Sequence, residues 1–154
     1  MQAKNDGIQP KVLEAIQSEW KHELGVTITI LSVEQKTWVE NMQTLNYTIS
    51  TGGWVGDFLD PITFLDLFVT GGGNNWTGWG NASYDALIAK ARATTDPTAR
   101  LEVFQQAETL LLQEVPVTPL YFGARVYLID PQVKGWPPAL LGNHRYSKVS
   151  FARP

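Results

Sequence analysis

Two consecutive segments with helical periodicity, residues 81–94 and 96–115, constrain the fold of this chain more than any other part of its sequence. Each opens with a residue that can cap a helix, Asn81 or Asp96, and Pro97 takes the first helical position of the second. Apolar residues recur every three or four positions, which predicts one core-facing side on each helix. The expected core residues are Tyr84, Leu87, Ile88 and Ala91, then Leu101, Phe104, Ala107, Leu111 and Val115.

The first third of the chain alternates helical and extended patterns. Pro10 predicts the start of a helix that ends just before Gly25. The alternating, β-branched run over residues 26–31 is typical of a strand with one buried face. A second helix is expected over residues 33–44 and a further strand around 46–50. Helices alternating with strands predict an α/β domain with a sheet flanked by helices.

Composition indicates a binding surface. The 154 residues are enough for one domain with a substantial core. Charged residues make up 18% of the chain, below the usual level of about 25%, and there are six Trp. A surface with few charges and many aromatic side chains favours a face that contacts a ligand.

Several classes of function are disfavoured. The net charge of −3 and the absence of a Lys and Arg stripe argue against nucleic acid. Without Cys there is no disulfide framework and no thiolate site, and neither His22 nor His144 has a second His at metal-ligand spacing, so we expect no metal and no cofactor. No apolar run approaches the roughly 20 residues needed to cross a bilayer. Residues 1–11 lack the apolar segment of a signal peptide, so we expect a cytoplasmic chain or a piece of a longer one.

The stretch "TGGWVGDFLDPITFLDLF", which starts at Thr51, places two carboxylates among large apolar side chains. Asp60 precedes Pro61 and can cap the following helix. Asp57 has no such structural duty, and it follows Trp54 by three residues in a glycine-flanked loop after an expected strand. Loops of this kind often carry the binding residues of α/β domains. A cationic, partly apolar ligand is the partner that Asp57 and Trp54 together favour.

Several separated motifs resemble the C-terminal part of the oligopeptide and dipeptide solute-binding proteins of bacterial ABC importers, extracellular solute-binding protein family 5. They are "GGWVGDFLDPITFLDLF", "NWTGWGNASYDALIAKAR" and "RLEVFQQAETLLLQEVPVTPLYF", and the similarity extends over nearly the whole chain. The resemblance implies one lobe of a type II periplasmic-binding-protein-like fold with a mixed sheet. It also implies that the Asp of a W-x-x-D motif, here Asp57, accepts the α-ammonium of a peptide beside Trp54. Gly53 and Gly56, with Gly52, are the expected neighbours where a ligand backbone approaches.

The same resemblance implies a division of the chain and a set of partners. Residues 1–124 would form the C-terminal lobe, and residues 125–154 a tail that returns to a first lobe absent from this chain. The parent protein would be extracytoplasmic, at the cell surface or in the periplasm, and would deliver an oligopeptide or dipeptide to an ABC permease. Apolar surface that the first lobe would cover makes self-association of this chain an expectation.

Two other classes of function stay open. The first is a sugar-binding or other solute-binding relative, in which Trp54, Trp76 and Trp79 stack on the ligand. The second is a small hydrolase that uses Asp57 with Asp60, or with Ser50 or Ser83, in the manner of paired carboxylates. No nucleophile motif or oxyanion site accompanies those residues, so we expect a binding protein rather than an enzyme.

Overall fold

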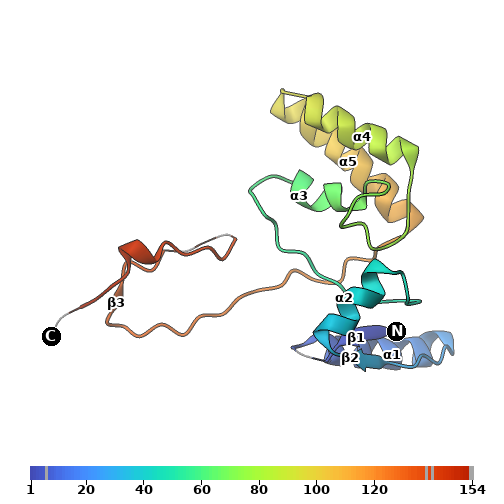
Figure 1. Cartoon of the computed structure of the whole chain (residues 1–154), viewed down its shortest axis with the longest axis horizontal. Helices are drawn as coiled ribbons and strands as arrows, with labels where there is room; N and C mark the ends of the chain where they lie inside the picture. Colours follow the sequence, from blue (N-terminus) through green and yellow to red (C-terminus); the bar gives the residue numbers. More distant parts are fainter. Residues whose placement is uncertain (6, 138, 140, 153–154) are drawn as a thin grey trace.

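The computed structural model describes residues 1–5, 7–137, 139 and 141–152. The chain is α/β, and Figure 1 shows three successive groups of elements. The first group contains β1 (Gln2–Lys4), α1 (Gln9–Leu24), β2 (Leu31–Val33) and α2 (Gln35–Gln43). The second contains α3 (Ile62–Leu65), the 3-10 turn η1 (Asp66–Phe68), α4 (Ala82–Ala93) and α5 (Pro97–Glu114). The third is a tail that reaches away from both, with β3 (Val133–Lys134), the 3-10 turn η2 (Tyr146–Lys148) and β4 (Ser150–Phe151).

The main core lies between α4 and α5, with α3 packed against it. Its buried side chains are Tyr84, Ile88, Ala91, Val103, Phe104, Ala107 and Leu111. Two expected core positions are wrong, because Leu101 is 53% exposed and Val115 is 61% exposed. Val115 follows the last residue of α5 with a left-handed φ of 54°, and Val103 occupies the buried face of α5 in place of Leu101.

The predicted caps of these two helices are confirmed. The Asn81 side chain accepts hydrogen bonds from the backbone N–H groups of Ser83 and Tyr84, at 2.9 and 3.1 Å. The Asp96 carboxylate accepts one from Ala99 N–H at 2.8 Å. Each cap satisfies amide groups that the first helical turn leaves without an internal partner.

A second, smaller core surrounds β1. The parallel pairing of β1 with β2 aligns Gln2 with Leu31, and the other edge of β1 meets Ser50 in an isolated parallel bridge. The expected strand near residues 46–50 is thereby reduced to one bridge. The buried apolar side chains of this core are Ala3, Leu13, Trp38 and Met42.

The strand predicted over residues 26–31 is wrong except at its last residue. Helix α1 ends as expected at Gly25, which has a left-handed φ of 67°, but the chain stays irregular until Leu31. The register explains this, because Leu31 lies opposite Gln2 and earlier residues therefore extend past the start of the partner strand. Only a few contacts remain there, such as the 2.7 Å hydrogen bond from the Met1 ammonium to the Thr29 carbonyl.

The tail contains more packing than its Pro and Gly content suggests. Strands β3 and β4 pair antiparallel, with Val133 opposite Phe151. A group of aromatic rings lies beside them, with the His144 imidazole 4.3 Å from Trp136 and 5.1 Å from Tyr127, measured between ring centroids. No helix among the described residues is long and apolar enough to cross a membrane.

Candidate functional site

The loop that joins the Ser50 bridge to α3 carries the candidate ligand residues (Figure 1). It is anchored to α3 at two points. The Asp57 backbone N–H donates to the Thr63 hydroxyl at 2.9 Å. Gly56 is buried, and a Cβ there would lie 3.1 Å from the Thr63 methyl and 3.2 Å from the Phe64 ring. The absence of a side chain at Gly56 therefore lets the loop lie close against α3.

The structure brings Trp54 and Asp57 to one pocket of about 260 Å³. Trp54 is 37% exposed, and Asp57 is also exposed. The rest of the wall comes from Phe58 in the same loop and from α3, η1, the loop after η1 and α4: Ile62, Thr63, Asp66, Leu67, Val69, Gly72, Gly73, Asn74 and Arg92. Gly53 does not line this pocket. The space beside it is open, because a Cβ at this position would have no neighbouring atom within 4 Å.

The two carboxylates at the pocket differ in whether a positive charge compensates them. Asp66 forms an ion pair with Arg92, so these two charges largely compensate each other. The carboxylate of Asp57 has no ion pair and accepts no hydrogen bond within the part of the chain that the structure describes. A carboxylate that is accessible and uncompensated attracts a cationic group of a ligand.

Asp60 is engaged in structure, as its position before Pro61 predicts. Its Oδ1 accepts a hydrogen bond from the Ile62 N–H at 3.0 Å, which caps the turn into α3. Both carboxylate oxygens also accept hydrogen bonds from the Arg100 guanidinium on α5, at 2.5 and 3.0 Å. The Arg100 hydrogen bonds, aided by the Ile62 N–H, hold the pKa of Asp60 below its ordinary value. Asp60 therefore joins α3 to α5 and is not free to act as an acid or base.

The remaining residues of the alternative hypotheses do not line this pocket. The Trp76 ring packs edge-on against Trp38, and Trp79 packs on Tyr84 while its indole N–H donates to Glu114. The Ser50 hydroxyl accepts a hydrogen bond from the Trp38 indole at 3.2 Å. Among the described residues, no three acidic or His side chains gather as a metal site would require.

Sequence reasoning missed the contributions of Thr63, Asp66 and Arg92. Thr63 and Asp66 lie in the helical turns that follow Trp54 and Asp57 in the sequence. Helical spacing could therefore have predicted that they lie near the pocket. Arg92 comes from the far end of α4, and only the packing of α4 beside α3 brings it to the pocket.

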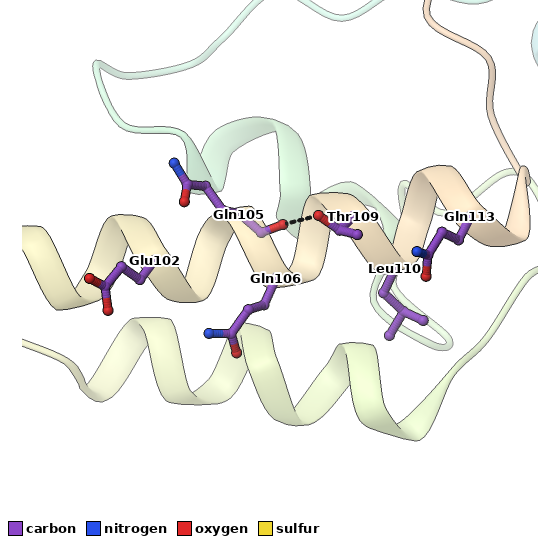
Figure 2. A pocket seen from close by; sticks show the side chains of 6 residues that line it. All are labelled: Glu102, Gln105, Gln106, Thr109, Leu110 and Gln113. Atoms are coloured by element: carbon purple, nitrogen blue, oxygen red, sulfur yellow. Dashed lines mark hydrogen bonds between the residues drawn. The ribbon is translucent and has the colours of Figure 1, made fainter.

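A second hollow of about 450 Å³ lies along one side of α5. Figure 2 shows that its side chains all project from this single helix, and five of the six are polar: Glu102, Gln105, Gln106, Thr109, Leu110 and Gln113. The Thr109 hydroxyl donates to the Gln105 carbonyl within the helix. A shallow surface formed by one helix has no groups converging from several directions, so it is the weaker candidate for a small-molecule site.

Comparison with solved structures defines the class of protein. An oligopeptide-binding protein of Borrelia burgdorferi superposes with a TM-score of 0.87 at 29% identity, covering 97% of this chain and 31% of that one. An oligopeptide ABC transporter substrate-binding domain of Bacillus anthracis gives 0.84 at 32% identity, covering 99% and 31%. The fold is therefore that of one part of a periplasmic-type solute-binding protein.

Sequence comparison finds similarity to one family of such proteins. Residues 1–76 match "Bacterial extracellular solute-binding proteins, family 5 Middle". The dipeptide-binding protein DppE of Bacillus subtilis is 40% identical over 125 residues, which are 81% of this chain and 23% of DppE. The oligopeptide-binding protein OppA of the same organism is 37% identical over 84% of this chain and 24% of its own length. The chain is therefore similar to these solute-binding proteins over about four fifths of its length, and it spans about a quarter of the length of these relatives.

Proposed function

We propose that this chain is a ligand-binding lobe of the peptide-binding component of an ABC importer, and that Asp57 accepts the α-ammonium of the peptide. One observation carries the proposal: Asp57 is the exposed, uncompensated carboxylate at a pocket where Asp66 is paired with Arg92. The relatives named as dipeptide-binding and oligopeptide-binding proteins support peptide as the ligand class.

Trp54 and the glycines of the loop have distinct roles in this proposal. The indole of Trp54 forms a wall beside Asp57, which reduces water around an ammonium group and strengthens its attraction to the carboxylate. Open space at Gly53 leaves room for a peptide backbone to approach the loop. Gly56 acts indirectly, because its contact with α3 sets the position of Asp57.

We further propose that residues 1–124 form the lobe and that residues 125–154 are a tail which docks on another part of a longer protein. In that protein a further lobe would complete the cleft, and a permease would receive the peptide. Relatives named as periplasmic, such as the murein peptide-binding protein MppA of Escherichia coli, favour an extracytoplasmic location. This binding role involves no catalytic step.

Calorimetric titration with di- to pentapeptides, each also supplied N-acetylated, tests the proposal. We expect the free-amine peptides to bind more tightly than their acetylated forms. Asp57→Asn should remove that difference, because the acetylated peptide has no ammonium group for the carboxylate to attract. The double variant Asp66→Asn with Arg92→Gln is the matched control, since it removes a carboxylate of the same pocket together with the guanidinium that compensates it and so leaves the net charge of the pocket unchanged.

The outcomes separate the ligand classes. A preference for free amines that survives Asp57→Asn contradicts the role of Asp57. One relative is named as a probable deoxycholate-binding protein, so this bile anion belongs in the same titration. Binding of deoxycholate that tightens in the Asp57→Asn variant, with no heat from any peptide, would replace peptide by an apolar anion as the ligand.

A further inference from the structure

The loop of residues 69–81, called the Gly73 loop, joins η1 to α4 and reaches α2 in the first group of elements (Figure 1). Its contact there is aromatic. The Trp76 ring lies 6.0 Å from the Trp38 ring of α2, measured between centroids, at an interplanar angle of 76°. This is the edge-to-face geometry that aromatic pairs favour. Trp38 is only 6% exposed, so Trp76 packs on the core around β1.

Each indole of this pair donates a hydrogen bond to one of the two loops that wall the pocket. The Trp38 N–H donates to the Thr51 carbonyl at 3.1 Å, at the start of the loop before α3, called the Asp57 loop. The Trp76 N–H donates to the Gly73 carbonyl at 3.1 Å, and Gly73 lines the pocket. One aromatic contact therefore connects two loops that are distant in the sequence.

Two further contacts hold the Gly73 loop in this place. The Tyr47 hydroxyl donates to the Trp76 carbonyl. Burial raises the pKa of Tyr47 above its ordinary value, so the phenol keeps the proton that it donates. The Leu45 side chain fills the space beside Gly78, where a Cβ would lie 2.8 Å from its Cδ1 atom. The loop is thus fixed against the first group of elements by its backbone as well as by its aromatic ring.

We propose that Trp38 and Trp76 are positioning residues for the pocket of Asp57, and that they act as a pair to hold its two loops at a fixed separation. The inference rests on the proposed peptide-binding function, because it concerns the same pocket. Neither side chain lines the pocket, so each acts through the backbone that it binds. Walls that are tied together before the ligand arrives need less ordering on binding, which favours affinity.

Hydrogen exchange of the ligand-free chain tests the pair, because each loop has an amide that reports on it. In the Asp57 loop the reporter is the Asp57 N–H, which donates to the Thr63 hydroxyl at 2.9 Å. In the Gly73 loop it is the Asn75 N–H, which donates to the Gly72 carbonyl at 2.9 Å. The amide of Ile88, in the core of α4, is the internal reference for global unfolding.

Trp76→Leu removes both the aromatic contact and the N–H that holds the Gly73 loop. The Asp57 amide should then exchange about fivefold faster, which corresponds to the roughly 1 kcal/mol that one hydrogen bond contributes. Trp38→Phe, the second variant, removes the N–H bound to Thr51 and should accelerate exchange at Asn75. Combining the two should accelerate exchange at Asp57 no further, because residues that act as a unit are not additive.

Trp79→Leu is the matched control, since it makes the same substitution in the same loop. It also removes an indole N–H, but the acceptor of that bond is Glu114 and the ring packs on Tyr84. Exchange at Asp57 should therefore stay as in wild type. Acceleration at Asp57 that is equal in Trp76→Leu and Trp79→Leu, or equal at Asp57 and the Ile88 reference, would overturn the proposal.

Peptide titration then measures the effect of the pair on binding. Trp76→Leu should weaken the free-amine and the N-acetylated forms of a peptide by the same factor, about fivefold, because Asp57 keeps its charge. Asp57→Asn should weaken only the free-amine form. Unchanged affinity for both forms in Trp76→Leu would overturn the role of the pair in the pocket. A wild-type chain that binds no peptide would contradict the proposed function, and the exchange pattern would still decide whether the pair holds the two loops.

Discussion

Substitution of Asp60 separates two contributions that one carboxylate makes to stability. Asp60→Ala removes the acceptor for the Ile62 N–H and leaves the Arg100 guanidinium without its acidic partner. Asp60→Asn keeps an oxygen that can accept from Ile62 but removes the negative charge. The difference between the two variants therefore measures the cap, and the cost of Asp60→Asn measures the charge.

The magnitudes follow from the contacts. Loss of a helix cap costs about 1 kcal/mol. The carboxylate's other hydrogen bonds add about 1 kcal/mol more, the usual net contribution of a partly buried hydrogen bond. We expect Asp60→Ala to lower the free energy of unfolding by about 2 kcal/mol. With a urea dependence of about 2 kcal/mol per molar, the midpoint should fall by about 1 M.

The pH dependence supplies an independent check. The folded pKa of Asp60 is depressed, so its charge stabilises the fold above the unfolded pKa of about 3.9 and the effect is lost as pH falls through the folded pKa. Wild type and Asp60→Asn should thus differ near neutral pH and converge in acid. Urea unfolding followed by circular dichroism measures both. Equal losses in the two variants, unchanged between neutral and acid pH, would refute the assignment of separate cap and charge contributions.

Two further substitutions test the packing of the chain. Tyr84→Phe leaves the Leu65 carbonyl without the hydroxyl that donates to it at 2.6 Å, so stability should fall by about 1 kcal/mol in a urea titration. Gly135→Ala places a Cβ 2.0 Å from the Lys148 carbonyl oxygen at a φ of 73°, so amide exchange across β3 and β4 should accelerate while that of α4 and α5 stays unchanged.

The local parts of the fold could be predicted from the sequence. The caps at Asn81 and Asp96 and the end of α1 at Gly25 depend on groups within a few residues, and the structure confirms them. The strand at residues 26–31 could not be predicted, because a strand needs a partner. Its partner β1 lies at the start of the chain and reaches only the last residue of that run.

The candidate site shows the same limit. The motif identified Trp54 and Asp57, whose nearness follows from three residues of separation. It did not predict that Asp66 would be compensated, because Arg92 reaches the pocket from another helix. Tertiary packing therefore decides that Asp57 is the uncompensated carboxylate of the pocket and Asp66 is not. The sequence alone shows only that Asp57 is present.

The exposure of Asp57 sets an upper limit on what its charge contributes in this chain. An ion pair in contact with water contributes about 0.2 to 1 kcal/mol, which corresponds to at most about a fivefold change in affinity. Acetylation of the peptide amine should therefore weaken binding to this chain by no more than that factor, and added salt should reduce the difference. A much larger effect would require that water be excluded from Asp57, which is open in this structure. Because desolvation strengthens such a pair, covering this pocket with a further lobe would increase the preference for a free amine.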